Sequence, residues 1–167
     1  MNASVLFFKP VEEEWENISN SIRHQMASRS YRAANELRNA SLLVLRGQRS
    51  GRRYIVPGTG RMTYNKRNHT AKITYRRYTA SAPGEPPAVR TGAFRLSWQP
   101  KAYVDHTGDH YAVVSSVEST QRTDNGKYLL GEVLEYGTSR MAPRPHHQAI
   151  QKKALPGIMR IYSEPYV

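Results

Sequence analysis

The chain has 167 residues, which suffices for a single domain with an ordinary buried core. It contains no cysteine, which excludes disulfides and thiolate metal sites and is typical of a protein that folds in a reducing compartment such as the cytoplasm. Its net charge of +12 favours an acidic partner, either a protein surface or nucleic acid. No stretch approaches the roughly 20 apolar residues of a membrane span, and the short apolar run 5–8 has no basic segment before it. We therefore expect no signal peptide and no membrane partner.

The first predicted element is a long amphipathic helix between Pro10 and Arg46. Pro10 suits a first helical turn, and Gly47 suits the residue after a helix end. A helix of about 36 residues would be about 54 Å long, longer than a domain of this size is wide. We therefore expect that part of it contacts another subunit, or that it bends near residues 27–30. Its apolar face recurs at steps of three and four or their sums: Val11, Trp15, Ile18, Ile22, Met26, Ala33, Leu37, Ala40 and Val44.

A basic segment follows the helix. No Asp or Glu occurs from Leu37 to Gly84, and 47–70 has no sustained hydrophobic period, so we predict a mobile or partner-ordered loop there. After it, Ile73 and Tyr75 alternate with polar residues, which predicts a half-buried strand. The candidate contacts to an acidic partner or to DNA are Arg52, Arg53, Arg61, Lys66, Arg67, Arg76 and Arg77.

Tyrosines are interleaved with these cations, as in proteins that stack on nucleic acid, but no nucleic-acid-binding motif organises them. An acidic protein neighbour is the leading interpretation, and DNA or a merely solvated surface are the alternatives.

Residues 81–92 read SAPGEPPAVRTG, with three prolines and two glycines, and predict an extended, polyproline-like loop. A loop this long inside a compact domain is usually functional or disordered. After it, Thr91 can cap a short helix that carries Phe94 and Trp98 and is ended by Pro100.

The remaining elements are predicted from shorter patterns. Segments 101–106 and 111–118 form a hairpin around a turn at 107–109, and the apolar stretch 128–136 is ended by Gly137 with a left-handed backbone. Pro145 opens a last helix, which breaks or kinks at the Pro156–Gly157 pair. The fold class is therefore α+β: one domain, 1–167, with a long N-terminal helix packed on a small antiparallel sheet of three or four strands, and two shorter helices.

No pattern indicates an enzyme. His106 and His110 flank a turn, and the pair His146 and His147 lacks a third ligand at the usual spacing for zinc. No nucleophile elbow or phosphate-binding loop is present, and Glu132 and Glu135 are explained by a solvated helix edge. We expect no catalytic residues, no metal and no cofactor.

Two segments in order resemble the signatures of the gene-product-ten-like tail-component family of long-tailed bacteriophages. They are SAPGEPPAVRTGAFRLSW, 81–98, and LEYGTSRMAPRPHHQA, 134–149. The matching residues of the first are Pro83, Gly84, Pro86, Pro87, Thr91, Gly92, Leu96 and Ser97. Those of the second are Glu135, Tyr136, Gly137, Thr138, Met141, Arg144 and Pro145. The chain departs from the family at His146 and His147, where an aromatic and an aliphatic residue are usual, and at the basic insertion 47–70.

The resemblance implies a non-enzymatic virion protein of the neck. It implies a homo-oligomeric ring, sixfold or twelvefold, between head-closure or adaptor proteins and tail-terminator or tail-tube proteins, with DNA in the channel, built in the host cytoplasm. The implied subunit and partner contacts are Pro83, Gly84, Pro86, Pro87, Thr91, Gly92, Glu135, Tyr136, Gly137, Thr138, Arg144 and Pro145. Two alternatives stay open: the two motif loops are stiffened only for stability, or the chain is a nucleic-acid-binding module that uses its basic segment 46–77.

Overall fold

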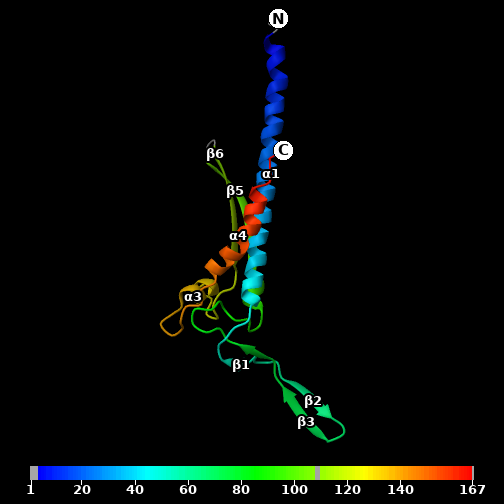
Figure 1. The fold of residues 1–167 in the computed structure, drawn as a ribbon, viewed down its shortest axis with the longest axis vertical. Helices are drawn as coiled ribbons and strands as arrows, with labels where there is room; N and C mark the ends of the chain where they lie inside the picture. Colours follow the sequence, from blue (N-terminus) through cyan, green and yellow to red (C-terminus); the bar gives the residue numbers. More distant parts are fainter. Residues whose placement is uncertain (1–3, 108–109, 167) are drawn as a thin grey trace.

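The computed structural model describes residues 4–107 and 110–166, with the side chains of 11–103 and 114–166. The molecule is elongated and is dominated by helix α1 (Ser4–Arg46). Figure 1 shows that the N-terminal half of α1 projects alone, that the other elements gather around its C-terminal half, and that a β arm projects from the opposite end. None of the described helices is long and apolar enough to cross a membrane.

The expected α+β class is confirmed. Among the described residues, six strands pair as three antiparallel two-stranded sheets: β1 (Arg53–Ile55) with β4 (Arg77–Thr79), β2 (Arg61–Asn65) with β3 (Thr70–Thr74), and β5 (Trp98–Thr107) with β6 (His110–Ser119). The other helices are α2 (Ala93–Leu96), α3 (Leu130–Tyr136) and α4 (His147–Tyr162). The predicted hairpin is present as β5 and β6, whereas its turn residues 108–109 and the side chains of His106 and His110 lie outside the described part.

The core lies where the C-terminal half of α1 meets the β5–β6 hairpin and α4. Its buried members are Ala40, Leu45, Trp98, Ile150 and Ala154, with Leu37, Val44, Phe94, Val117 and Ile158 packed against them. This burial of apolar surface is the main force that holds the three elements together.

Small residues let α4 approach α1 closely. Ala33 and Ala34 of α1 are fully buried, and a Cβ added to Gly157 would lie 3.0 Å from the Glu36 carboxylate. Of the break or kink predicted at Pro156–Gly157, the break is wrong, because α4 continues to Tyr162. The kink stays a prediction. Pro156 is on the exposed side of α4, where water can hydrate the carbonyl that a proline leaves without a backbone donor.

Helix α1 differs from its prediction at the N-terminal end. It begins at Ser4, so Pro10 lies inside it, and it contains 43 residues. Figure 1 shows α1 as an uninterrupted rod through residues 27–30, which leaves contact with another subunit as the remaining expectation. The predicted apolar face is covered from Met26 onward, but its first four members are exposed: Val11, Trp15, Ile18 and Ile22.

The stretch predicted as an irregular loop, 47–70, instead supplies β1 and β2 of the β arm, which we define as residues 53–79. Side chains pair across both ladders: Tyr54 lies opposite Tyr78, with their ring centroids 5.9 Å apart, and Met62 lies opposite Ile73. The half-buried strand predicted around Ile73 is wrong in its burial, because every residue of β2 and β3 is exposed. Whether the arm is mobile in an isolated subunit stays a prediction.

Trp98 was also placed in the wrong element. It opens β5 opposite Ser119, and Pro100 lies within β5 opposite Val117 instead of ending a helix. Both strands of a two-stranded sheet are edge strands. A proline is therefore tolerated where its nitrogen faces away from the partner strand and no hydrogen-bond donor is needed. Helix α2 is confirmed but has only four residues, and its N-cap is Gly92 instead of the predicted Thr91. Thr91 Oγ1 still accepts a hydrogen bond from the Ala93 N–H at 3.3 Å.

Candidate subunit and partner interface

The two signature segments lie against one another. The Gly84 N–H donates to the Pro143 carbonyl at 3.1 Å. Arg144 donates through Nη1 to the Ser81 carbonyl at 2.5 Å and also to Ser81 Oγ. Segments that are far apart in the chain therefore form one surface, which we call the signature surface, 81–98 with 134–149.

Loop 81–92 is tied to the end of α1. The Glu85 carboxylate accepts hydrogen bonds from Ser50 Oγ at 2.7 Å, the Ala82 N–H at 2.9 Å and the Ser50 N–H at 3.1 Å. These bonds, led by that of the Ser50 hydroxyl, lower the pKa of Glu85 to about 2. The loop is thus extended but anchored.

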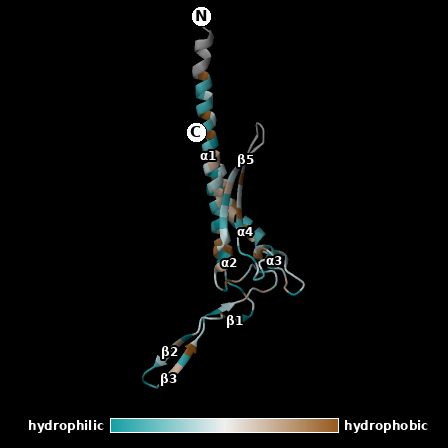
Figure 2. Cartoon of the chain, turned by 180° about the vertical axis from the view of Figure 1, so that it is seen from behind, coloured by the Kyte–Doolittle hydropathy of each residue, from teal (hydrophilic) through white to brown (hydrophobic). Residues whose placement is uncertain are grey.

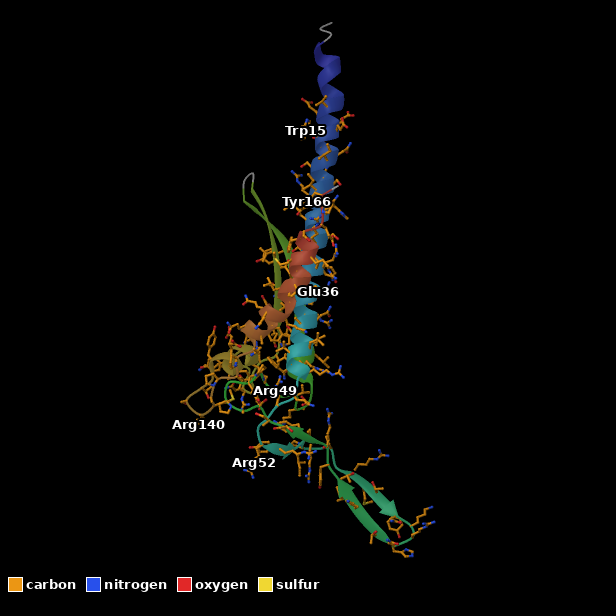
Figure 3. All side chains as sticks on the ribbon, in the orientation of Figure 1. Trp15, Glu36, Arg49, Arg52, Arg140 and Tyr166 are labelled. Atoms are coloured by element: carbon orange, nitrogen blue, oxygen red, sulfur yellow. The ribbon has the colours of Figure 1, made fainter. Side chains whose placement is uncertain are left out.

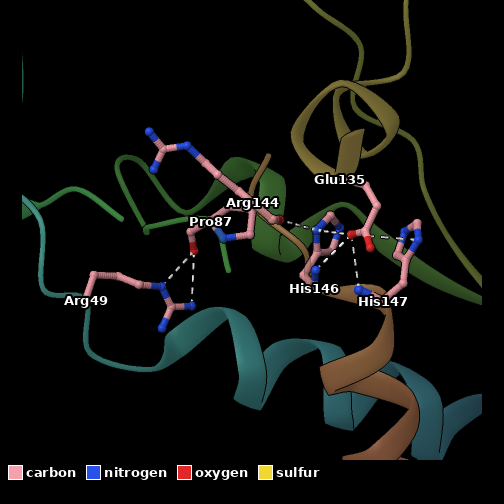
Figure 4. A network of polar contacts seen from close by, with 6 residues as sticks. All are labelled: Arg49, Pro87, Glu135, Arg144, His146 and His147. Carbon is pink, nitrogen blue, oxygen red and sulfur yellow. Dashed lines mark hydrogen bonds and ion pairs between the residues drawn. The ribbon is translucent and has the colours of Figure 1, made fainter. Parts of the chain in front are cut away.

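Arg49 makes a second anchor. Its Nη2 donates to the Val44 carbonyl at 2.8 Å at the end of α1, and its Nε and Nη2 donate to the Pro87 carbonyl at 3.3 and 3.2 Å (Figure 4). Pro87 is buried within its own chain, whereas Pro83 and Gly84 are exposed. The loop therefore exposes its tip, and its anchored end is held at Pro87.

Gly137 makes the turn between α3 and the second signature possible. Its N–H donates to the Val133 carbonyl at 3.0 Å, and its φ of 76° confirms the predicted positive value. Its ψ of −170° differs from a left-handed helix and belongs to a region open essentially to glycine alone. Thr138 and Met141 then close a tight turn with two backbone bonds, at 2.8 and 3.2 Å.

Glu135 caps helix α4 from α3. Its Oε2 accepts the backbone N–H groups of His146 at 2.8 Å and His147 at 3.2 Å (Figure 4). A carboxylate at a helix N-terminus satisfies free donors and complements the helix dipole. The role expected for Glu135, a solvated edge, is therefore corrected: its side chain is only 13% exposed and joins two helices.

His146 completes this contact. Its ring is fully buried, packs edge-on against Phe94 and Trp98, and places Nδ1 2.8 Å from Glu135 Oε2 and 3.1 Å from the Arg144 carbonyl. Both neighbours are acceptors, so Nδ1 carries the proton. His146 thus packs as an aromatic ring, and its Nδ1–H donates to the Arg144 carbonyl beside the Glu135 carboxylate.

We expect the free energy of unfolding to fall as the pH drops below about 6.5. Burial lowers the pKa of His146, with smaller opposing contributions from the Arg144 carbonyl and Glu135. The unfolded ring therefore takes up a proton at a pH where the folded ring stays neutral, and stability is lost as pH falls through the unfolded value. Urea unfolding at pH 7.5 and 5.5 measures this loss.

The control for this pH effect is His146→Asn, which keeps a donor near Nδ1 but cannot titrate. This variant should lose less stability than wild type between the two pH values, whereas His24→Asn, on the exposed part of α1, should behave as wild type. An unchanged pH dependence in His146→Asn would contradict the assignment.

The same three side chains could in principle hold a metal ion, because one ligand atom from each of Glu135, His146 and His147 lies within 4.8 Å of the others. In the observed arrangement, however, His146 Nδ1 is a donor and Glu135 Oε2 already accepts two backbone bonds. These bonds make the cluster a helix cap, and a cation bound at these atoms would have to displace them.

A cleft of ≈ 600 Å³ opens beside the signature surface. Apolar side chains of α1, α2 and α3 line it, namely Leu45, Phe94 and Leu134, together with the cations Arg90, Arg95 and Arg144. Thr91 and Gly92 also lie on its wall. The carboxylate Asp124 is on the wall as well, so the lining is apolar with charges of both signs.

The structure places the candidate partner residues in two groups. Tyr136 is 76% exposed, and Thr138 and Pro145 are exposed beside it. The seven candidate cations, in contrast, lie on the β arm or at its base, and all are exposed: Arg52, Arg53, Arg61, Lys66, Arg67, Arg76 and Arg77. Figure 3 shows Arg52 near the base of the arm and Arg140 at the outer edge of the signature surface.

Sequence reasoning missed Arg49, Ser50 and Glu85 as anchors. Glu85 could have been noticed, because it is a single acidic residue between the prolines of an otherwise basic region.

Comparisons with protein families, with curated proteins and with solved structures found no match to this chain.

Proposed function

We propose that this chain is a non-enzymatic virion protein of the phage neck. In this proposal it assembles in the host cytoplasm as a homo-oligomeric ring, sixfold or twelvefold, and joins the tail to the head. It works by shape and contact, with no cofactor. The observation that carries the proposal is the signature surface, because two motifs that resemble one family hydrogen-bond to each other through Gly84 with Pro143 and Arg144 with Ser81.

The distribution of exposed groups supports assembly. Stiff, anchored segments lose little conformational entropy when they bind a neighbour. Pro83 and Gly84 at the loop tip, and Tyr136 and Thr138 in the second signature segment, include the exposed residues of such segments. We assign these residues to contacts with neighbouring rings or subunits, and Pro87, Glu135, Gly137 and Arg144 to holding them in place.

The mass of the purified particle tests the ring. Light scattering should give six or twelve subunits, and negative-stain images should show closed rings. Tyr136→Ser should reduce binding to tail or head-closure proteins, whereas Tyr128→Ser, an exposed tyrosine outside the signature surface, should not. A monomer at all concentrations, or equal effects of both substitutions, would refute the proposal. A neighbourhood of portal, capsid and tail-tube genes would support it independently.

The second candidate is a nucleic-acid-binding module, which the exposed basic β arm favours. Phosphate binding predicts a log-log salt slope of about −0.9 for each phosphate neutralised on duplex DNA. Under the neck proposal, we expect weak DNA binding with a shallower salt dependence, because tight binding would slow the release of DNA through the channel. Titration of short duplexes with wild type and with an Arg52, Arg53, Arg61, Arg67→Ser variant decides between them. Tight, salt-steep binding that this variant loses would favour the alternative.

A further inference from the structure

The tip half of the β arm is an amphipathic ribbon with no covering partner in the described chain. Met62 lies directly opposite Ile73, and Tyr64 opposite Ala71, so these four side chains share one face. Met62 is 70% exposed, and Ile73 and Tyr64 are more than half exposed. Figure 2 shows hydrophobic colour on β3 far from the core. A two-stranded ribbon is marginally stable alone, so this face indicates a binding surface.

Cations border this apolar face. Lys66 and Arg67 form the turn at the tip, and Arg61 and Lys72 lie on the reverse face, from which long side chains can reach around a ribbon two strands wide. The arm has no acidic residue, so its partner must offer apolar surface bordered by negative charge.

The exposed half of α1 offers that combination. Val11, Trp15, Ile18 and Ile22 are spaced four, three and four residues apart and form one uncovered stripe. At 100° per residue, Glu12 and Glu14 fall on the two sides of this stripe, whereas Glu13 and Glu16 fall on the far side. Residues 11–22 contain these four glutamates and no Lys or Arg.

The two surfaces cannot meet within one chain. Figure 1 places the N-terminal half of α1 and the tip of the β arm at opposite ends of the molecule, and Figure 3 shows Trp15 far from Arg52. Pairing of like surfaces is disfavoured, because two acidic stripes or two basic ribbons would bring equal charges together.

We propose that the apolar face of the β arm, Met62, Tyr64, Ala71 and Ile73, docks on the α1 stripe, Val11, Trp15, Ile18 and Ile22, of a second copy of this chain. The contact is heterologous, since different surfaces of the two copies meet, and repeated contacts of this kind close a ring or extend a chain. This contact deepens the proposed function, because closure of the contacts into a neck ring rests on that function. The pairing itself rests only on the two surfaces.

Engineered disulfides map the contact directly, because the chain has no cysteine of its own. A chain with both Trp15→Cys and Met62→Cys should give a ladder of disulfide-linked multimers on oxidation. The largest multimer in the ladder gives the number of subunits in the ring. Each single substitution should give no cross-link. Tyr31→Cys, exposed on the core-bound half of α1, combined with Met62→Cys is the matched control and should give no ladder.

The outcomes separate the possible interfaces. Self-cross-linking of Trp15→Cys alone would show that α1 pairs with α1 and would overturn the proposal. So would the absence of a ladder from an assembled double variant, which would place the contact elsewhere.

Charge reversal is the second test. Glu12, Glu14→Lys should abolish assembly, and so should Lys66, Arg67→Glu, whereas the two together should restore it. Glu13, Glu16→Lys, on the far side of the helix, should leave assembly intact. All these residues are exposed, so circular dichroism should show unchanged folding. Failure of the combined variant to recover would overturn the pairing.

The two proposals fail separately. If the double-cysteine variant forms the ladder but the protein does not join heads to tails, the proposed contact is supported and the neck function is refuted. If the protein joins heads to tails but no ladder forms, the neck function is supported and the proposed contact is refuted.

Discussion

Gly137→Ala should lower the free energy of unfolding by about 2–4 kcal/mol. Two costs add at this position. A side chain is strained at φ 76° and ψ −170°, and a Cβ would lie 2.6 Å from the Met141 carbonyl oxygen and 2.8 Å from the Pro143 nitrogen. Both neighbours are backbone atoms of the second signature, so they cannot move without disturbing the turn that follows α3. Urea unfolding followed by circular dichroism measures the loss.

Gly126→Ala separates the two costs. Gly126 also has a positive φ, 68°, but no atom lies within 4 Å of an added Cβ. This control should cost only about 1 kcal/mol, the conformational part. Equal losses in the two variants would show that the close approach at Gly137 does not matter and would weaken the account of the signature surface.

Glu135→Ala should have the second large effect, a loss of about 2–4 kcal/mol. The substitution removes the acceptor of two backbone N–H groups at the start of α4, and it removes the carboxylate that lies 2.8 Å from the buried His146 Nδ1. Buried donors left without partners cost more than the bonds themselves contributed, because water does not replace the lost acceptor. Thermal and urea unfolding should both report the loss.

Two variants test the cap at Glu135 specifically. Glu135→Gln keeps an acceptor oxygen but loses the charge, so its stability should fall between those of wild type and Glu135→Ala. Glu132→Ala, exposed on the same helix, should cost less than about 0.5 kcal/mol. If Glu132→Ala were as damaging as Glu135→Ala, the effect would belong to α3 and not to the cap.

The sequence predicted elements where a hydrophobic period was sustained. The repeat in α1 identified the helix and its buried face, and alternation identified β5 and β6. The β arm was missed because its residues pair across two ladders while facing solvent, which leaves little burial pattern to read. Trp98 was misplaced because a four-residue helix and the strand after it lie within one apolar run.

The candidate interface could be predicted only in part. The two motifs identified its segments, and the position of Gly137 directly after an apolar stretch predicted its positive φ. The long-range bonds could not be inferred, since nothing in a local pattern shows that Glu135 caps a helix beginning 12 residues later or that Arg49 reaches Pro87. The sequence did not identify the uncovered stripe on α1 directly. It showed only that the helix is longer than a domain of this size is wide, so that part of it should lack a partner within the chain.

The most direct measurement of the central claim is head–tail joining in a phage whose copy of this gene has been deleted. The account predicts complete heads and complete tails that stay separate in electron micrographs of the lysate, and infectious particles after the purified protein is added. It also predicts that the Glu12, Glu14→Lys variant fails to restore infectivity and that the Glu13, Glu16→Lys variant succeeds. Joined, infectious virions in the absence of the protein would contradict the account.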